Sequence, residues 1–467
     1  MTRERLVPLI VAVALFMENM DSTVISTSLP AIAADIGSSP LELKLAITSY
    51  LLALAIFIPA SGWMADRYGA RNVFRAAIVI FTLGSVLCGR AESLSFLVFA
   101  RIFQGVGGAM MVPVGRLLLL RTAPKSEIVA AMAWLSMPAL IGPVVGPPLG
   151  GFIVTYVSWR WVFDINVPVG LLGVLLVSYY VEDVREGALA RLDGWGLLLA
   201  GLAMSGVMVG LETAGRGMVE PWVTWAMLSA GVVAGIGYAV HARNHPAPLL
   251  DFSLFRIPTF LVSVLGGTLF RVGVGAVPFL LPLMLQIGFG RSAAESGLIT
   301  FASSAGAIVM KPAAMGALKK FGFRDTLLSN AVISALLLML CAAFRPAWPA
   351  AGIYAALLIG GFFRSLQFTA YNAVAYADVP RERMSAATSL YSTIQQVSLT
   401  LGVSMGAAVL EISMRATGRA HPGLPDFTAA FIAVAFVSLM AAPATLLMPR
   451  NAAEEMSGHA STPPRAA

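Results

Sequence analysis

Long apolar segments recur along this 467-residue chain, each bounded by polar, glycine or proline clusters. A helix of about 20 apolar residues is long enough to cross a bilayer, because each residue rises about 1.5 Å. Hydrophobic residues make up 58% of the chain and charged residues 12%, against roughly 45–50% and 25% in soluble domains. The pattern therefore predicts an all-α polytopic membrane protein. Fourteen approximate spans are expected, at 7–29, 42–63, 74–90, 93–118, 127–156, 161–180, 193–212, 221–241, 257–286, 293–316, 324–344, 347–375, 384–411 and 426–448.

Lysine and arginine are distributed unevenly between the two sides of the predicted membrane. When loops are assigned to alternating sides, the side of the N-terminus collects more than twice as many. Cytoplasmic loops carry such an excess, so both termini are expected in the cytoplasm. The formal net charge of +7 then reflects topology, and no nucleic-acid partner is expected. Arg3 and Arg5 precede the first apolar run as in a signal peptide, but that run exceeds the usual length, which favours an uncleaved first span.

The first span contains two carboxylates, Glu18 and Asp21. Ionisable residues inside a membrane helix are costly, so each is a candidate functional residue. They are three residues apart and share one helix face. Two carboxyls so close in apolar surroundings are suited to taking up and releasing a proton. The alternative is that one of them only balances a buried arginine.

Arg101 is the candidate partner of these acids. In the expected topology it lies about eight residues, or ~12 Å, from the outer end of the fourth span. The first span ends near Leu29 on the same outer side, and Asp21 lies about eight residues from that end. The two side chains are therefore expected at one depth, where they can pair and then separate when Asp21 is protonated. Glu18, one turn deeper, is expected to be a second proton site or a substrate contact.

Two similar turns suggest an internal repeat. The second span closes with a glycine- and arginine-rich run that ends at Gly69 and Arg71, and the tenth closes with a run in which Gly322 and Arg324 occupy the matching places. Weak symmetry of this kind is typical of transporters built from two halves. We therefore expect a six-helix bundle over 1–180, two linker transmembrane helices over 181–256, a second six-helix bundle over 257–449 and a disordered cytoplasmic tail over 450–467.

Three motifs together carry a family resemblance. They are Gly62–Arg71, Arg101–Gly108 and Gly142–Gly151. With them the chain resembles the major facilitator superfamily and, more narrowly, its fourteen-helix drug:proton antiporters. The runs Met20–Val24 and Trp159–Gly170 are also similar, and Ser61–Arg71 and Gln104–Arg116 look most like the multidrug-resistance translocase D branch. The resemblance implies two six-helix bundles plus two inserted helices, a bacterial inner-membrane location and a monomer.

The resemblance also implies roles for individual residues. It identifies a cytoplasmic gating motif and an antiporter motif, and it supports proton coupling by Asp21 and Arg101. The antiporter motif would seal the outward route through close helix packing, although a plain kinked, tightly packed helix is the alternative. The gating residues are Gly62, Asp66, Arg67, Gly69 and Arg71, and the antiporter residues are Gly142, Pro143, Gly146, Gly150 and Gly151.

The second half of the chain departs from a simple cation exporter. Arg271, Lys311 and Arg364 lie within predicted spans, where a cluster of cations disfavours a cationic drug. They are expected to pair with Glu18 and Asp21, to bind an anionic or zwitterionic amphiphile or, for Lys311, to reach the membrane surface. Candidate pocket residues are Met17, Gln104, Met110, Arg271, Gln286, Lys311, Arg364, Tyr371, Asn372, Tyr391 and Gln395.

Several other functions find little support in the sequence. No Gly-x-x-x-x-Gly-Lys-[Ser/Thr] loop is present, so ATP hydrolysis by such a loop is excluded. Cys88 and Cys341 are expected in the core, and His241 and His245, although four residues apart, have no third metal ligand near them in sequence. An enzyme, a metal site and a cofactor are therefore not expected. The leading hypothesis is proton-driven export of lipophilic small molecules. The alternative is export of a specific metabolite, siderophore or lipid.

Overall fold

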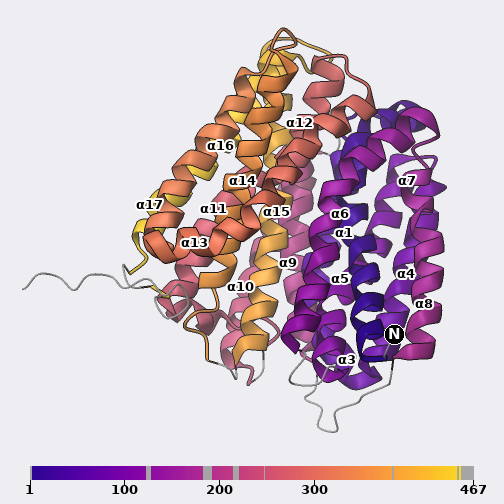
Figure 1. Ribbon diagram of the computed structural model, residues 1–467, viewed down its shortest axis with the longest axis vertical. Helices are drawn as coiled ribbons and strands as arrows, with labels where there is room; N and C mark the ends of the chain where they lie inside the picture. Colours follow the sequence, from indigo (N-terminus) through magenta and orange to yellow (C-terminus); the bar gives the residue numbers. More distant parts are fainter. Residues whose placement is uncertain are drawn as a thin grey trace, which may run out of the picture. The chain divides into compact units, whose positions relative to one another are not determined.

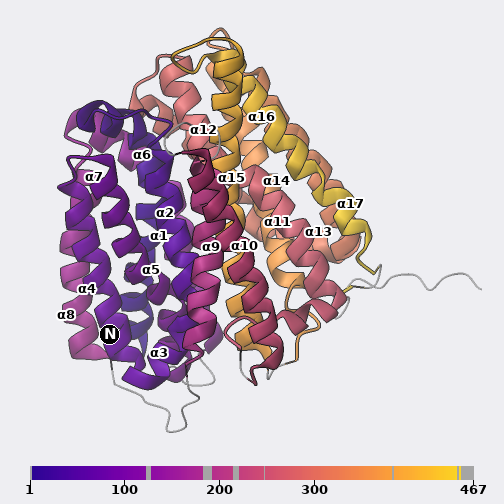
Figure 2. The ribbon, with the colours of Figure 1, turned by 180° about the vertical axis from the view of Figure 1, so that it is seen from behind.

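The computed structural model describes residues 3–122, 128–181, 192–213, 220–246, 248–380, 383–449 and 452–453. These residues form helices and connecting turns, with no strand among them. The chain divides into two compact units, one comprising Met1–Leu250 with Arg291–Leu298 and the other Asp251–Gly290 with Ile299–Ala467. Each unit is a bundle of long helices (Figures 1 and 2). Apart from 452–453, the predicted tail over 450–467 lies outside the described residues.

The first unit contains the helices that precede Leu250 in the sequence. Its membrane-length helices pack side by side, and two short helices, α3 and α7, lie at turns. The elements are α1 (Arg3–Ile36), α2 (Lys44–Phe57), the 3-10 turn η1 (Ile58–Ala60), α3 (Ser61–Tyr68), α4 (Ala70–Gly89), α5 (Leu94–Thr122), α6 (Ile128–Tyr156), α7 (Trp161–Asp164), α8 (Asn166–Tyr180), α9 (Gly194–Thr213) and α10 (Pro221–Asn244).

The second unit contains the helices that follow Leu250 in the sequence. One of them, α13, is divided, because its first residues, up to Leu298, belong to the first unit. The elements are η2 (Phe252–Arg256), α11 (Pro258–Gly275), α12 (Val277–Leu283), the π-helical turn η3 (Met284–Gly288), α13 (Ala293–Leu340), η4 (Cys341–Ala343), α14 (Ala350–Val374), α15 (Met384–Ala416), α16 (Leu424–Leu439) and α17 (Ala441–Leu446).

The helices agree with the predicted spans in number and position. Within the described residues, thirteen helices are long and apolar enough to cross a membrane, and Val144–Tyr156, part of α6, is a shorter apolar helix in the place of the fifth span. The expected break between the tenth and eleventh spans is a kink at Gly322 inside α13 rather than a loop. The structure is therefore that of an all-α, multi-pass membrane protein with about fourteen helices.

Close packing of α1 against α6 depends on a row of glycines. Gly142, Gly146 and Gly150 are spaced by four residues and so lie on one face of α6. A Cβ atom at Gly146 would lie 2.1 Å from Thr23 Oγ1, and one at Gly150 would lie 2.6 Å from the Val24 carbonyl oxygen. The missing side chains therefore allow α6 to approach the part of α1 that carries the predicted acids.

The two inserted helices pack closely on each other and belong to the first unit. A Cβ atom at Gly206 in α9 would lie 2.7 Å from Gly231 Cα in α10, so the two backbones are nearly in contact. A buried ion pair between Lys44 of α2 and Glu212 of α9 attaches the pair to the bundle. Sequence analysis did not find this ion pair.

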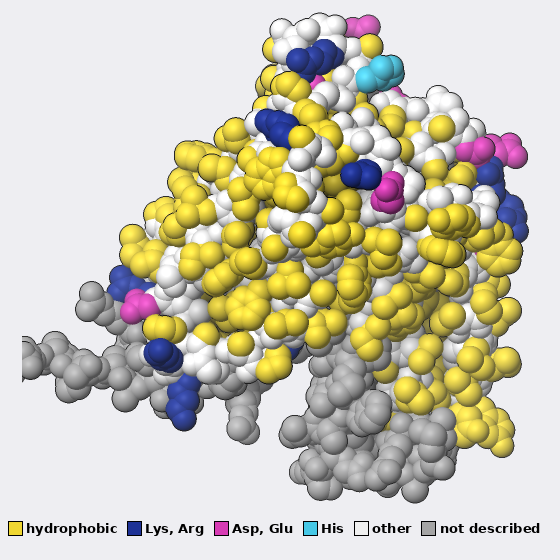
Figure 3. Space-filling view, turned by 45° about the horizontal axis from the view of Figure 1, so that its top comes forward, with side chains coloured by type: hydrophobic (Ala, Val, Ile, Leu, Met, Phe, Trp, Pro, Cys, Tyr) yellow, Lys and Arg dark blue, Asp and Glu magenta, His cyan; other side chains and the backbone are white. Residues whose placement is uncertain are grey.

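The outer surface is rich in apolar side chains. On the face shown in Figure 3, hydrophobic side chains predominate and charged ones are few. Large exposed residues include Leu171, Leu175 and Tyr179 of α8 and Trp222 and Trp225 of α10. An apolar surface of this extent is the one expected where helices face lipid.

Candidate functional site

Asp21 and Arg101 form a buried ion pair inside the first unit. Asp21 lies in the middle of α1 and Arg101 in the first half of α5, and both side chains are at most 1% exposed. The Arg101 Nη1 atom donates to Asp21 Oδ2 at 2.6 Å. The equal depth predicted by counting residues along the two helices is thus confirmed, while the role of the pair in proton coupling stays a prediction.

Two amide side chains complete the surroundings of Asp21. Gln104 Nε2 and Asn166 Nδ2 donate to Asp21 Oδ1 at 2.9 and 2.8 Å. Both amides also donate to Ser85 Oγ, at 2.7 and 3.1 Å. Gln104 Oε1 accepts from Arg101 Nη1 at 2.7 Å. One carboxylate on α1 is therefore held by donors from α5 and α8, with Ser85 of α4 between the amides.

Further contacts fix Arg101 and connect it to Glu18. Its Nε atom donates to the Ala46 carbonyl oxygen in α2 at 2.9 Å, and its guanidinium lies 4.2 Å from the centre of the Tyr50 ring, a cation–π distance. The Tyr50 hydroxyl donates to Glu18 Oε1 at 3.1 Å. Tyr50 therefore contacts both Glu18, through its hydroxyl, and the arginine that pairs with Asp21, through its ring.

The sequence identified part of this network. Gln104 was expected in a substrate pocket, but it is fully buried and bonded to Asp21, Arg101 and Ser85, which corrects that prediction. Tyr50, Ser85 and Asn166 were missed. An isolated serine, tyrosine or asparagine in an apolar helix gives no sign of its partner, because the contact depends on how the helices pack. Asn166 alone had a signal, since it lies in the run Trp159–Gly170 that supported the resemblance.

The gating motif forms the turn between α3 and α4. Gly69 has a φ of 87°, a value that favours glycine. Arg71 donates through Nη2 to the carbonyl oxygen of Ser178 near the end of α8. Asp66 is half-buried, and Gly62 and Arg67 are exposed. The expectation that pairing of Asp66 and Arg67 forms and breaks between the outward and inward states stays a prediction.

The matching turn in the second unit has the same construction. Gly322 has a φ of 71°, and Arg324 Nη2 donates to the Leu446 carbonyl oxygen at the end of α17 at 3.1 Å. A cation at a helix C-terminus is favourable because carbonyl groups there are unpaired and the helix dipole is negative. The two turns, which were matched by their sequences, therefore also agree in backbone geometry and in the contact that the arginine makes.

The antiporter motif lies where α6 meets α1. A Cβ atom at Gly142 would lie 3.0 Å from Asn19 Cβ, so Gly142 begins the same row of contacts as Gly146 and Gly150. Gly151 faces elsewhere, since its Cβ would meet the Ala293 carbonyl oxygen in the segment Arg291–Leu298 of this unit. Pro143 is within α6, but its side chain lies outside the described residues.

In the second unit, Arg271 is the centre of another buried polar group. Its Nη2 atom donates to Asn372 Oδ1 at 3.0 Å and to the Tyr391 hydroxyl at 2.5 Å. Its guanidinium lies over the rings of Tyr391 and Phe368 at 4.7 and 5.2 Å. The Nε and Nη1 atoms are buried and have no hydrogen-bond partner in the part of the chain that the structure describes. The structure thus brings together Arg271, Asn372 and Tyr391, which were predicted as pocket residues.

The other predicted pocket residues fall into three groups. Met17, Met110 and Tyr371 are buried in hydrophobic cores, so the structure gives them a packing role instead. Lys311 is exposed and donates to Thr369, as expected of a lysine that reaches the surface, and Arg364, which donates to Ser303, is only half-buried. Gln286 and Gln395 are half-buried, and their proposed role stays a prediction.

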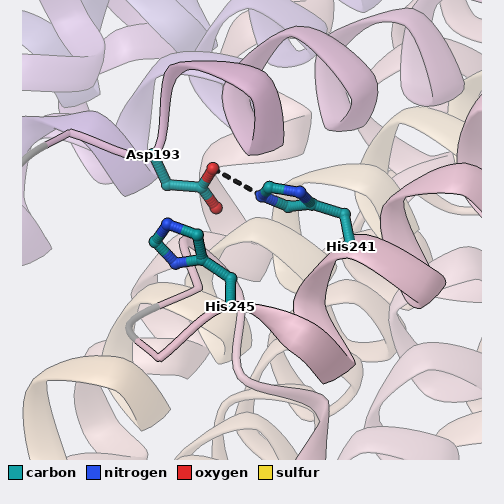
Figure 4. Close-up of side chains that lie close together, drawn as sticks. All are labelled: Asp193, His241 and His245. Carbon is teal, nitrogen blue, oxygen red and sulfur yellow. Dashed lines mark hydrogen bonds and ion pairs between the residues drawn. The ribbon is translucent and has the colours of Figure 1, made fainter.

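A third polar cluster joins α9 and α10 (Figure 4). His241 and His245 lie one turn apart near the end of α10, and both rings point toward the carboxylate of Asp193, directly before α9. Asp193 is 48 residues from His241 in sequence, so the third group that lies near these histidines in space could not be found by its spacing along the chain. Burial alone would raise the pKa of Asp193, but hydrogen bonds from Gly196, His241 and Leu249 outweigh it and lower that pKa below its ordinary value.

These observations define a class of protein. Many membrane-length helices and a charged network buried inside one bundle are features that membrane transporters share. The family model described as the Major Facilitator Superfamily matches residues 11–277 and again 263–464. The chain belongs to that superfamily.

Relatives in two enterobacteria narrow the comparison. The chain is 37% identical over 419 residues to the multidrug resistance protein MdtD of Salmonella typhimurium, covering 89% of this chain and 87% of the relative. It is 36% identical over 440 residues to MdtD of Pectobacterium atrosepticum, covering 94% of each chain. The resemblance to the multidrug-resistance translocase D branch, which the sequence motifs suggested, is thus confirmed over most of the chain.

Solved transporters share the fold at much lower identity. A bacterial homologue of the human lysosomal transporter Spinster, in an inward-facing and unoccupied conformation, has a TM-score of 0.67 at 17% identity and covers 99% of each chain. The D-xylose–proton symporter has a TM-score of 0.66 at 14% identity, with coverage of 96% of this chain and 100% of that chain. At these identities the likeness extends to the fold only.

Proposed function

We propose that this transporter is a proton-coupled antiporter that exports lipophilic or amphiphilic small molecules by alternating access. In this proposal it acts as a monomer in the bacterial inner membrane, both termini are cytoplasmic, and the proton is the only coupling ion. The relatives named for multidrug resistance support the class of cargo. The buried surroundings of Asp21 support the coupling mechanism.

The observation that carries the proposal is that, among the described residues, every direct partner of the Asp21 carboxylate is a donor. Arg101, Gln104 and Asn166 approach through N–H groups at 2.6–2.9 Å. A protonated carboxyl offers its own O–H and loses acceptor capacity. Since N–H donors cannot accept that proton's hydrogen bond, protonation must break at least one contact. Proton uptake is thereby coupled to a change in how α1 packs against α5 and α8.

Glu18 provides a second position for a proton. It lies one helical turn from Asp21, and the Tyr50 hydroxyl between Glu18 and Arg101 is both a donor and an acceptor. A proton can therefore be held at Glu18 before or after it is held at Asp21. In the proposed cycle one proton enters this group from outside, releases the ion pair and leaves toward the cytoplasm as cargo moves outward.

The test is substitution of Asp21 by Asn in purified full-length protein in proteoliposomes, with efflux of a panel of lipophilic compounds driven by an imposed pH gradient. Asp21→Asn removes the titrating group and is expected to reduce gradient-driven transport to the background of empty vesicles. Asp35→Asn is a matched control on the same helix, because Asp35 pairs with Arg160 at the exposed end of α1. Full gradient-driven transport by Asp21→Asn would remove the acid from the mechanism.

Arg271 favours a second candidate function, the export of an anionic or zwitterionic metabolite, siderophore or lipid. No carboxylate among the described residues pairs with this arginine, and two of its three nitrogen atoms are buried without partners. An unpaired buried charge is strongly unfavourable. A carboxylate or phosphate on the cargo would supply the missing acceptors, in the two-bond geometry that arginine favours.

Competition between matched amphiphiles distinguishes the two functions. If the cargo is anionic, a carboxylate compound will inhibit transport at lower concentration than its amine counterpart. Arg271→Gln will abolish this difference, whereas Lys311→Gln will keep it because Lys311 is at the surface. Equal inhibition by the amine in wild-type protein would favour the general exporter of lipophilic drugs.

A further inference from the structure

The hairpin formed by α9 and α10 carries a group of side chains that the transport mechanism does not use. One ligand atom from each of Asp193, His241 and His245 lies within 4.8 Å of the others. The three residues converge because α9 and α10 are antiparallel neighbours, so that the start of one helix lies beside the end of the other (Figure 4). Among the described residues, this is the one group of three or more histidine, cysteine or acidic side chains whose ligand atoms lie so close together.

The carboxylate is fixed in position by the backbone. Asp193 directly precedes α9, and its Oδ1 atom accepts from the Gly196 N–H at 2.8 Å, the contact of a helix N-cap. Its Oδ2 atom accepts from the Leu249 N–H at 3.3 Å. Its side chain is only 3% exposed. Such neighbours hold a metal ligand in place and are costly to lose.

The imidazoles are positioned by the last turns of α10. His241 Nε2 lies 2.6 Å from Asp193 Oδ1, and the rings of His241 and His245 are 5.2 Å apart and nearly parallel. Tyr238, on the preceding turn, donates to the Leu250 carbonyl and accepts from the Leu250 N–H. Those two bonds hold the chain after α10 against the helix. His241 remains accessible, with 25% of its side chain exposed.

We propose that Asp193, His241 and His245 bind a divalent transition metal, with Zn²⁺ as the best match and water completing the coordination. Two imidazoles and one carboxylate are ligands that suit Zn²⁺ and its neighbours in the first transition row, whereas Mg²⁺ and Ca²⁺ prefer oxygen. Zn²⁺ binds these groups at about 2.0–2.2 Å, so tetrahedral ligand atoms lie about 3.3 Å apart. The ligand atoms lie within 4.8 Å of one another and the pair from Asp193 and His241 is at 2.6 Å, so the spacings in the cluster bracket that value.

The bound metal would replace a hydrogen bond by coordination. Without metal, His241 Nε2 and Asp193 Oδ1 lie at hydrogen-bond distance. When Zn²⁺ binds, Nε2 becomes a ligand through its lone pair and any proton on it is released, as metal binding at histidine generally requires. The metal would then join the start of α9 to the end of α10. We infer that it stabilises the open end of this hairpin, opposite the loop that connects α9 and α10, independently of proton-coupled transport.

The experiment measures Zn²⁺ binding to the full-length protein, purified without a polyhistidine tag and stripped with a chelator. Titration calorimetry is expected to give one site, and Co²⁺ is expected to give the visible absorption of a low-symmetry complex. Loss of an outer contact to a metal ligand already weakens binding about 10–100-fold, so His245→Ala and Asp193→Asn are each expected to weaken it ~100-fold or more. Asn retains an N-cap at position 193.

Controls separate this site from adventitious binding and from misfolding. His421→Ala removes a histidine from the loop between α15 and α16 and is expected to leave binding unchanged. His245→Ala keeps the hydrogen bond between Asp193 and His241, so the metal-free variant is its own baseline and its unfolding temperature is expected not to change when Zn²⁺ is added. The wild type alone should become more stable on addition of Zn²⁺. The proposal is overturned if no stoichiometric site is found, or if His245→Ala and Asp193→Asn bind as the wild type does.

Discussion

Arg101 shows how one side chain can connect three helices. Its Nη1 atom donates to Asp21 on α1 and to Gln104 on α5, and its Nε atom donates to the Ala46 carbonyl on α2. Its guanidinium lies over the ring of Tyr50. A lysine has the same charge but neither the planar group nor the second nitrogen position. Charge alone therefore does not define the site.

We predict that Arg101→Lys loses gradient-driven transport almost as completely as Arg101→Ala. The ammonium can still pair with Asp21, but the bonds to Ala46 and Gln104 cannot both be kept. Transport in proteoliposomes gives the result, and thermal unfolding of the purified variants identifies any loss of fold. Arg160→Lys is the control, since that arginine is partly exposed. Transport by Arg101→Lys at more than about half the wild-type rate would show that positive charge is sufficient.

A second prediction concerns pH and the second unit. Burial alone would raise the pKa of Asp251, but hydrogen bonds from Ser253 and Arg383 outweigh it and lower that pKa below its ordinary value, which is about 4. A carboxyl with a lowered pKa stabilises the fold above its unfolded-state pKa, and this contribution is lost as pH falls through the folded-state pKa. Asp251→Asn is therefore expected to lower the unfolding temperature at pH 6.

Acidification should reduce the difference between Asp251→Asn and the wild type, because protonation removes the same charge. Thermal unfolding at several pH values between about 6 and 3 measures this. Asp378→Asn is a useful comparison, because Asp378 is an exposed acid that accepts a hydrogen bond from Thr259. A difference that grows as the pH falls would contradict the assignment.

The residue-scale site could be predicted from sequence only where one-dimensional information was sufficient. Counting turns placed Asp21 and Arg101 at one depth, because helix rise is regular. The same count says nothing about rotation of one helix against another. Asn166, Ser85 and Tyr50 therefore could not be assigned to Asp21, and Asp193 could not be assigned to His241. For the same reason the sequence did not indicate that Met17 and Tyr371 pack in hydrophobic cores.

At the scale of helices, glycine spacing was more informative than any single glycine. The row of Gly142, Gly146 and Gly150 was expected to permit close packing, and α1 is the helix that it approaches. The partner could not be read from sequence, since a small-residue face fits any helix. The predicted break between the tenth and eleventh spans was also right in position, although it is the kink at Gly322 and not a loop.

We predict that Gly150→Ala destabilises the first unit and impairs transport, whereas Gly173→Ala does neither. A Cβ at position 150 would lie 2.6 Å from the Val24 carbonyl oxygen, a backbone atom that cannot move alone, but one at position 173 would lie 3.6 Å from Ile78. Overpacking of this kind typically costs about 1–3 kcal/mol. Chemical or thermal unfolding in detergent measures the difference. Equal stability of the two variants would show that α1 and α6 can separate without cost.

The whole molecule shows its internal repeat at the ends of its helices. Gly69 and Gly322 both have a positive φ. Arg71 donates to a carbonyl oxygen near the end of α8, and Arg324 donates to one at the end of α17. By the same numbering offset, Glu18 of the first unit corresponds to Arg271 of the second. The two halves thus repeat their turns but reverse the charge of a central residue.

The number of crossings gives a prediction at this scale. If α6 crosses the membrane with the other thirteen helices, the total is even and both ends of the chain lie on one side. With Cys88 and Cys341 buried, single cysteines can be introduced at Thr417, after α15, and at Ser461 in the tail. In spheroplasts, a membrane-impermeant maleimide is expected to label position 417 at once and position 461 only after permeabilisation. Immediate labelling of position 461, with position 417 labelled only after permeabilisation, would indicate that α6 does not cross and that there are thirteen crossings.

The bond between Arg101 and the Ala46 carbonyl has an electrical consequence. A backbone carbonyl does not titrate at any physiological pH, so protonation of Asp21 leaves the acceptor of this bond unchanged. In the proposed cycle the guanidinium therefore stays with α2 and α5 and carries no current across the membrane field, in which each moved charge is worth about 2.3 kcal/mol per 100 mV. The net charge translocated per turnover will then equal the protons taken in minus the charge of the cargo sent out, so that an electrophysiological count of one yields the other.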